Sequence, residues 1–104
     1  MKGQQLTKLI IEHIVAHHDG WAANINVASK KGVPDILACI DGEFFAFEVK
    51  SKNDKEKPLQ TEQLLAITLA KGCSGYVRSL EDVDHIIANR IRFVQINPVK
   101  RLKL

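Results

Sequence analysis

Two short motifs near the middle of the chain combine side chains that suit phosphodiester hydrolysis. One is Gly-Val-Pro-Asp at residues 32–35, and the other is Glu-Val-Lys at residues 48–50. Carboxylates are ligands that Mg²⁺ prefers, together with water and phosphate oxygens. A metal makes its bound water more acidic and stabilises charge on the scissile phosphate, while a lysine can orient that water or take part in proton transfer. These residue types predict a metal-dependent phosphodiesterase.

The residues between the motifs predict a β-hairpin that brings them together. Two apolar runs, residues 36–40 and 44–49, flank the dipeptide Asp-Gly, which is typical of a tight hairpin turn. Because side chains alternate along a strand, Glu48 and Lys50 share one face, about 6.6 Å apart at roughly 3.3 Å per residue. The pairing places Asp35, at the start of the first strand, beside the end of the second. The three side chains are therefore expected to converge at one edge of the sheet.

Each motif alone also has an ordinary structural explanation. Pro-Asp is common in turns because Asp tolerates turn backbones, and Glu-x-Lys is typical of a solvated strand face. The joint pattern, with both motifs in order and a hairpin between them, favours the catalytic interpretation.

The rest of the chain predicts helices around these strands. Asp19-Gly20 ends the first helix, Pro58 suits the first turn of the second, and Gly72 ends it. The order α-β-β-β-α-β-α predicts one α/β domain spanning residues 1–104, a mixed sheet flanked by helices. The expected elements are helices at 5–18, 58–71 and 82–91, strands at 21–28, 36–40, 44–49 and 75–78, and a strand or extended tail at 93–96.

Apolar periodicity predicts which side chains fill the core. One stripe of the first helix is expected to face the sheet, and the aromatic residues are expected to be core more often than binding platforms. The residues assigned to the core or an interface on this basis include Leu6, Leu9, Ile10, Ile14 and His17 of the first helix, and Trp21, Cys39, Phe44, Phe45 and Phe47.

Composition narrows the class of protein. The net charge is +3, and residues 90–104 carry five Lys or Arg and no acid, so a basic tail at about 97–104 fits either a polyanionic partner or a solvated end. The two cysteines form no CxxC pair, which argues against a zinc site or a disulfide framework. No apolar run approaches the roughly 18 residues of a membrane span. An intracellular protein, of a cell or of a phage or virus in a bacterial host, is expected.

Residues 32–75 resemble the core of the PD-(D/E)xK nuclease superfamily, and within it the VRR-NUC (virus-type replication-repair nuclease) family. The shared pattern is a GxPD turn, an ExK strand, a polar loop with Asn53-Asp54, Gln60 opening the next helix and Gly72 closing it. The resemblance implies a restriction-endonuclease-like fold similar to Holliday junction resolvases. It also implies a Mg²⁺- or Mn²⁺-dependent DNA endonuclease in replication, repair or recombination, acting as a homodimer on branched DNA.

The resemblance also assigns roles to the central residues. Asp35 and Glu48 would bind the metal, and Lys50 would be the catalytic lysine. From its position between Glu48 and Lys50, the carbonyl of Val49 is expected to supply a further oxygen ligand.

Nucleic-acid contacts are expected around this set. Gln60 would lie near the active site or the DNA backbone, and Gln63 is a second candidate on the same helix face. Lys30, Lys31 and Lys52 would meet DNA phosphates at the mouth of the cleft; the alternative for such loop lysines is simple solvation.

The first helix departs from the family pattern, which often has a glutamate completing the metal site there. This region holds Gln4-Gln5, and the only acid on the helix, Glu12, points away from the apolar stripe, which favours a solvated glutamate. Gln5 is an alternative ligand, or Asp35, Glu48 and a carbonyl suffice. His13 and His17 are spaced as a metal pair, but no Glu follows the first His as the zinc-peptidase motif requires, which favours structural histidines.

A non-catalytic nucleic-acid-binding or assembly module is the alternative function, motivated by the basic tail and the doubtful helix acid. It does not explain Glu48 and Lys50 on one strand face, because acids in a DNA-facing groove would repel phosphate unless a metal lay between them.

Overall fold

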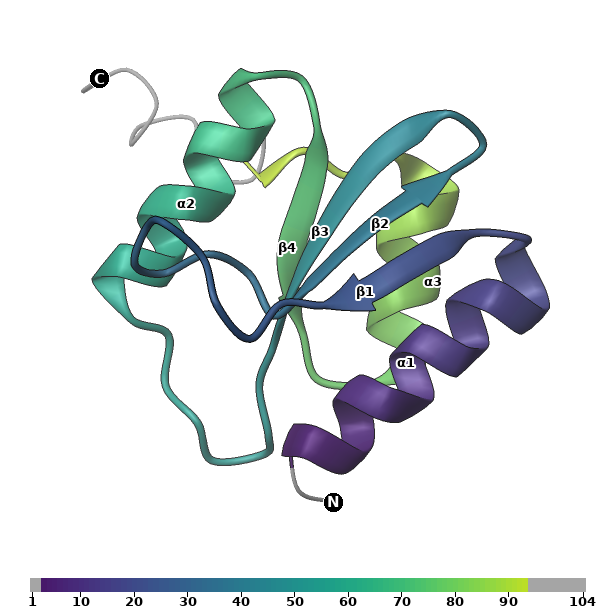
Figure 1. Ribbon diagram of the computed structural model, residues 1–104, viewed down its shortest axis with the longest axis horizontal. Helices are drawn as coiled ribbons and strands as arrows, with labels where there is room; N and C mark the ends of the chain where they lie inside the picture. The colour runs from purple at the N-terminus through teal and green to yellow at the C-terminus, as the bar shows by residue number, and fades with distance from the viewer. Residues whose placement is uncertain (1–2, 94–104) are drawn as a thin grey trace.

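The computed structural model describes residues 3–93, so the basic tail expected at about 97–104 and most of the element expected at 93–96 lie outside the described residues. The predicted order of elements is confirmed (Figure 1). The elements are α1 (Gly3–His18), β1 (Trp21–Asn24), β2 (Ile36–Ile40), β3 (Glu43–Val49), α2 (Pro58–Leu69), β4 (Cys73–Val77) and α3 (Leu80–Asn89).

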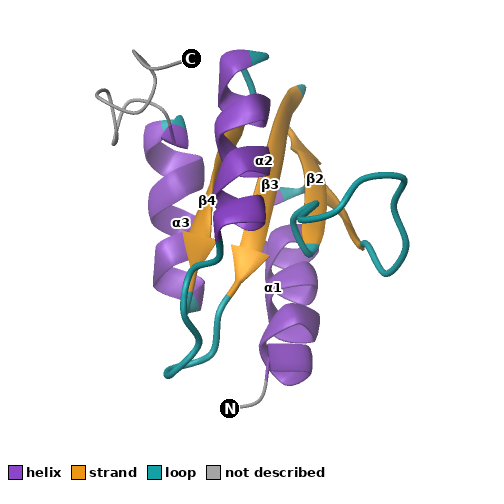
Figure 2. Cartoon of the chain, turned by 90° about the vertical axis from the view of Figure 1, so that its left-hand side faces the viewer, coloured by secondary structure: helices purple, strands orange, loops and turns teal. Residues whose placement is uncertain are grey.

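The four strands form one mixed sheet in the order β1-β2-β3-β4. The first two pairings are antiparallel, and β3 pairs in parallel with β4 because the intervening helix α2 returns the chain to the same end. Helix α2 covers one face of the sheet and helices α1 and α3 lie on the other (Figures 1 and 2). The result is the predicted α/β architecture of three layers, with the ends of β3 and β4 leading into polar loops.

The main core lies between the sheet and the pair α1 and α3. Phe45 and Phe47 of β3 are fully buried there, and their rings stack at a centroid distance of 6.1 Å. The alternate residues of β3 face α2, so the strand is buried on both sides. The helical residues that complete this core are Leu6, Ile10 and Ile14 of α1 and Val83, Ile86 and Ile87 of α3. Among the described helices, none is long and apolar enough to cross a membrane.

Most element boundaries differ from those expected: α1 begins at residue 3, β3 at 43 and β4 at 73, while α2 ends at residue 69, β4 at 77 and α3 at 89. Two further differences have a clear physical cause. Strand β1 ends at Asn24 rather than residue 28, because its partner β2 begins only at Ile36, which pairs with Asn24. Helix α3 begins at Leu80 rather than residue 82, because the Ser79 side chain accepts a hydrogen bond from the Asp82 backbone N–H and caps the helix.

Several core predictions were wrong, and most of the errors share a physical cause. Trp21, Cys39 and Phe44 are register partners across β1, β2 and β3, and all three are exposed, Trp21 at 62%. For Trp21, expected in the core or an interface, the exposure excludes only the core. They form a row on the face of the sheet that α2 covers over β3 and β4, so Trp21 on β1 and Cys39 on β2 lie beyond the helix, and Phe44 lies at the start of β3. On α1, Leu9 and His17 are also exposed, because the buried stripe continues through Thr7, Ile10 and Ile14 instead.

Candidate active site

The GxPD turn is fixed by close packing against the start of α2. Gly32 has φ +79°, and a Cβ added there would lie 2.4 Å from the carbonyl oxygen of Leu59. Only glycine therefore fits at this position. Pro34 is fully buried, and Asp35 follows it directly before β2. The turn thereby places Asp35 next to both the end of β3 and the first turn of α2.

Hydrogen bonds tie Asp35 to the end of β3. The Val49 backbone N–H donates to Asp35 Oδ2 at 2.9 Å, and the Ile25 N–H donates to the Asp35 carbonyl oxygen at 2.7 Å. One carboxylate oxygen of Asp35 is thus held by the backbone between Glu48 and Lys50. The structure brings these three side chains together at one end of the sheet, as the hairpin predicts.

Glu48 and Lys50 are both buried, each with 4% of its surface exposed. The Lys50 ammonium donates to Gln60 Oε1 at 2.6 Å and lies 5.8 Å from the centroid of the Tyr76 ring. The Lys50 backbone N–H donates to the Val77 carbonyl oxygen at 2.9 Å, which extends the β3–β4 pairing by one residue. Gln60 therefore orients the lysine from α2, while Gln63, one turn on, does not reach the site.

The ionisation of Glu48 is strongly perturbed by its surroundings. Burial, together with a hydrogen bond and the negative charge of Asp35, raises the pKa of Glu48 to about 8, although Lys50 and Lys57 act in the opposite direction. Near neutral pH Glu48 is therefore protonated and hydrogen-bonded to Asp35. A divalent cation could replace that proton, and two carboxylates with a neighbouring carbonyl form the hard oxygen set that suits Mg²⁺ or Mn²⁺. The residues present thus fit such a metal.

These side chains line a polar pocket of about 300 Å³. Helix α1 contributes Gly3 and Thr7 to its wall, and the Thr7 hydroxyl donates to the Gly3 carbonyl oxygen at 2.9 Å. Neither Gln5 nor Glu12 lines the pocket, and both side chains are exposed. The lining residues are Gly3, Thr7, Asp35, Glu48, Val49, Lys50, Asp54, Lys55, Lys57 and Gln60.

The lysines nearest this pocket are not the ones singled out from the sequence. Lys30 lines a separate hollow beside the GxPD turn, Lys31 is exposed in that turn, and Lys52 lines a pocket near the start of α3. Lys55 and Lys57, later in the same loop as Lys52, line the carboxylate pocket instead. The cluster of lysines between the ExK strand and Pro58 is visible in the sequence. The sequence does not show which of these lysines line the pocket.

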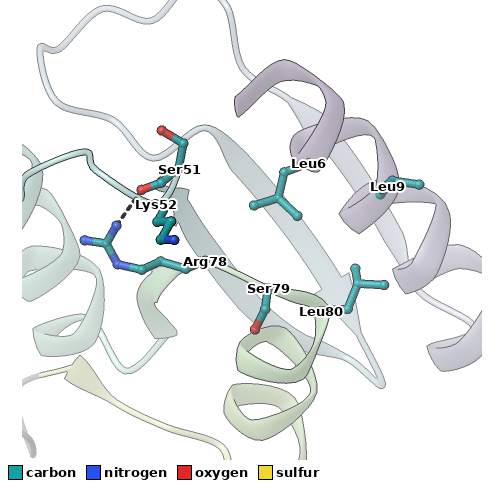
Figure 3. Close-up of a pocket in the computed structure, with 7 residues that line it drawn as sticks. All are labelled: Leu6, Leu9, Ser51, Lys52, Arg78, Ser79 and Leu80. Carbon is teal, nitrogen blue, oxygen red and sulfur yellow. Dashed lines mark hydrogen bonds between the residues drawn. The ribbon is translucent and has the colours of Figure 1, made fainter. Parts of the chain in front are cut away.

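Arg78 holds the loop that carries these lysines (Figure 3). Its guanidinium donates to the carbonyl oxygens of Ser51, at 2.6 Å, and Asp54, at 3.0 Å. The Asp54 carboxylate in turn accepts from the Ser51 backbone N–H and hydroxyl, and these hydrogen bonds lower its pKa. Sequence reasoning missed Arg78, because nothing in its neighbourhood marks a residue that binds carbonyls of a distant loop.

Comparisons with known proteins agree with this geometry. A family model described as archaeal Holliday junction resolvase (Hjc) matches residues 4–78. The fold is similar to a solved VRR_NUC domain, with a TM-score of 0.69 and 24% identity over 83% of this chain and 94% of that chain.

A second similar structure is Hjc of Archaeoglobus fulgidus, a Holliday junction resolvase, with a TM-score of 0.59 and 17% identity over 74% of this chain and 68% of that chain. No curated protein matches. The expected restriction-endonuclease-like fold is confirmed by these structures. The matched family model spans the GxPD turn, the ExK strand and the start of α2 within residues 4–78, and the chain therefore belongs to the archaeal Holliday junction resolvase (Hjc) family.

Proposed function

We propose that this protein is a divalent-metal-dependent endonuclease that cleaves branched DNA such as the four-way Holliday junction. The observation that carries the proposal is the convergence of Asp35, Glu48 and Lys50, two of them buried, in one polar pocket. Membership of the resolvase family supports the reaction class and the junction substrate. The role in replication, repair or recombination follows from that substrate.

The carboxylates of Asp35 and Glu48, with the carbonyl of Val49, would hold Mg²⁺ or Mn²⁺. The bound metal would acidify a water molecule and stabilise charge on the scissile phosphate. The protein's own contribution is to fix the acids. The Val49 N–H orients Asp35, and burial keeps Glu48 from relaxing into solvent. Because the pKa of Glu48 is about 8, metal binding at neutral pH would release a proton.

Lys50 is placed to act on the attacking water. The Lys50 ammonium has three N–H donors, and one of them donates to Gln60. The other two can donate to the water and to a phosphate oxygen. Burial of the ammonium beside Tyr76 restricts its rotamers, so the geometry is set before the substrate arrives. Gln60 thus acts as a positioning residue for the catalytic lysine.

DNA would reach this pocket along its lysine-bearing rim. Lys55 and Lys57 line the pocket and lie on the loop held by Arg78, so their charges can meet the phosphates that flank the cleaved bond. The other predicted DNA contacts lie farther from the carboxylates: Lys30, Lys31 and Lys52. Their contact with more distant phosphates stays a prediction. Binding through such contacts would weaken as salt rises.

A homodimer remains part of the proposal, because a four-way junction presents symmetry-related strands. The exposed row of Trp21, Cys39 and Phe44 supplies apolar surface that a second copy could cover. Sedimentation of the full chain would test this: a monomer at assay concentrations would argue against it.

The decisive experiment compares Lys50→Ala with the unchanged protein on matched linear, flapped and four-way DNA in Mg²⁺ or Mn²⁺. We expect cleavage of the junction to fall by about 10²–10⁴-fold, the range typical of a lost proton-transfer group, while junction binding without divalent metal persists.

Lys8→Ala is the matched control, since Lys8 is an exposed lysine of α1 that does not line the pocket. Cleavage surviving in Lys50→Ala would remove the catalytic assignment. Junction binding without cleavage by the unchanged protein, in either metal, would favour the non-catalytic binding module.

A further inference from the structure

A second cluster of metal-ligating side chains lies where helices α1 and α3 meet, away from the carboxylate pocket. His13 and His18 come from the last turns of α1, and Asp84 comes from the middle of α3. Both histidine Nε2 atoms lie 2.7 Å from the same oxygen, Asp84 Oδ1. The sequence suggested His13 with His17 as the pair on this helix, but the structure joins His13 with His18, and His17 is exposed.

The spacing of these atoms suits a tetrahedral metal ion. The three ligand atoms all lie within 4.8 Å of one another. Zinc binds imidazole nitrogen and carboxylate oxygen at roughly 2.0–2.2 Å, so tetrahedral ligands stand roughly 3.3–3.5 Å apart. Small side-chain rotations would open the two 2.7 Å contacts to that separation and draw the two nitrogens together.

The cluster is accessible to an ion from solution. The side chains of His13 and His18 are 15% and 22% exposed, and that of Asp84 is 48% exposed. Burial raises the pKa of Asp84, but hydrogen bonds from His18 and His13 outweigh it and leave the pKa below its usual value. The carboxylate is therefore ionised at neutral pH, as a metal ligand must be.

We propose that His13, His18 and Asp84 form a site for a transition-metal ion, Zn²⁺ or Co²⁺ in kind, which cross-links α1 to α3. Imidazole ligands favour such metals, whereas Mg²⁺ takes oxygen ligands. Three protein ligands leave a position for water, so the ion would be exchangeable rather than enclosed. Because α1 also contributes Gly3 and Thr7 to the carboxylate pocket, the cross-link would fix a helix that borders that pocket.

The competing explanation is a metal-free bridge in which both imidazoles hydrogen-bond to Asp84. The two differ in one measurable respect, since only the metal site gives saturable binding of a transition metal that depends on all three residues. The bridge predicts no specific binding at this place.

The test is titration of the full chain with Zn²⁺ by calorimetry and with Co²⁺ by visible absorption, in excess Mg²⁺ to occupy the carboxylate pocket. We expect one ion per chain, d–d bands of a nitrogen- and oxygen-ligated Co²⁺, and a melting temperature that rises with Zn²⁺ concentration. Loss of an outer-shell partner already costs roughly 10–100-fold in metal affinity. His18→Gln and Asp84→Asn are therefore expected to weaken binding at least that much.

His85→Gln is the matched control, because it removes a histidine outside the cluster, which is exposed on α3 and hydrogen-bonds only Asn89 among the described residues. It should bind Zn²⁺ as the unchanged protein does. Equal Zn²⁺ affinity in His18→Gln and the unchanged protein would overturn the site, and so would absence of saturable binding. If the variants fail to fold, ¹⁵N spectra of the unchanged protein decide: Zn²⁺ must shift the Nε2 signals of two histidines, and unchanged signals overturn the proposal.

Discussion

The carboxylate pocket and the histidine cluster both bring ionisable side chains together, but they differ in burial and in the charge of the groups that meet. In the pocket, Asp35 and Glu48 meet with Glu48 almost fully buried, and burial raises its pKa to about 8. In the cluster, Asp84 is half-exposed between His13 and His18, and its pKa is lowered. Like charges in a buried place oppose ionisation, whereas complementary partners near solvent support it.

Ionisation of Glu48 in the pocket therefore costs free energy, whereas ionisation of Asp84 in the cluster is stabilised by its partners. The pocket holds groups whose ionised forms repel each other, so Glu48 keeps its proton below about pH 8, and such shifted pKa values are common at functional sites. The cluster is satisfied without any ion, because each imidazole can hydrogen-bond Asp84. At neutral pH the pocket would therefore become fully ionised only with the proposed metal, whereas the cluster would gain only additional stability from one.

The largest expected effect comes from removing a charge in the pocket. Asp35→Asn keeps an oxygen that can accept from the Val49 N–H, so the GxPD turn should persist. It removes half of the carboxylate charge that would hold the metal. A metal contributes several kcal/mol to the transition state, so junction cleavage should fall by about a thousandfold, and the calorimetric signal of Mg²⁺ should disappear. Zn²⁺ binding at the histidine cluster should be unchanged in the same variant.

If Asp35→Asn bound Mg²⁺ with unchanged affinity, the carboxylate pocket would not be the Mg²⁺ site, and its contrast with the histidine cluster would be lost. Loss of Zn²⁺ binding would break it differently, since it would mean that the two regions are not independent.

The sequence predicted the pocket far better than the cluster, for a physical reason. Asp35, Glu48 and Lys50 are related by a hairpin, whose register follows from strand alternation and the Asp41-Gly42 turn, both local rules. Asp84 reaches His13 from 71 residues away through the packing of two helices, and no local rule sets that contact. The exposed row of Trp21, Cys39 and Phe44 was missed for a similar reason. The apolar pattern of a strand does not predict whether a helix will cover that strand.

The second prediction concerns the pH dependence of stability at Glu48. The folded pKa of about 8 exceeds the unfolded value of about 4.5, so the folded state binds the extra proton between them. Without metal, stability should be full below pH 4.5 and should fall as pH rises to 8, by at most about 1.4 kcal/mol per pH unit. Glu48→Gln mimics the protonated acid, so it should match the unchanged protein near pH 4.5 and exceed its stability at pH 8.

Urea unfolding followed by circular dichroism at several pH values measures this difference directly. Mg²⁺ should raise the stability of the unchanged protein at pH 8 and leave Glu48→Gln nearly unaffected. A stability difference between the two proteins that stays constant from pH 4.5 to 8 would mean that Glu48 is ionised in the metal-free fold, and the contrast with Asp84 would be lost.

The smallest effect, of opposite sign, is expected at Asp84. Its folded pKa lies below the unfolded value near 3.8, so its contribution is present above that value and is lost as pH falls through the folded pKa. Asp84→Asn should therefore be less stable than the unchanged protein at pH 5, by less than about 1 kcal/mol because the side chain is half-exposed. The difference should vanish at more acidic pH. The same urea series, extended to pH 2.5 in chelator, measures it. A gap that stays constant as the pH falls would trace the loss to helix packing rather than to the carboxylate, because protonation of Asp84 would then not change the difference.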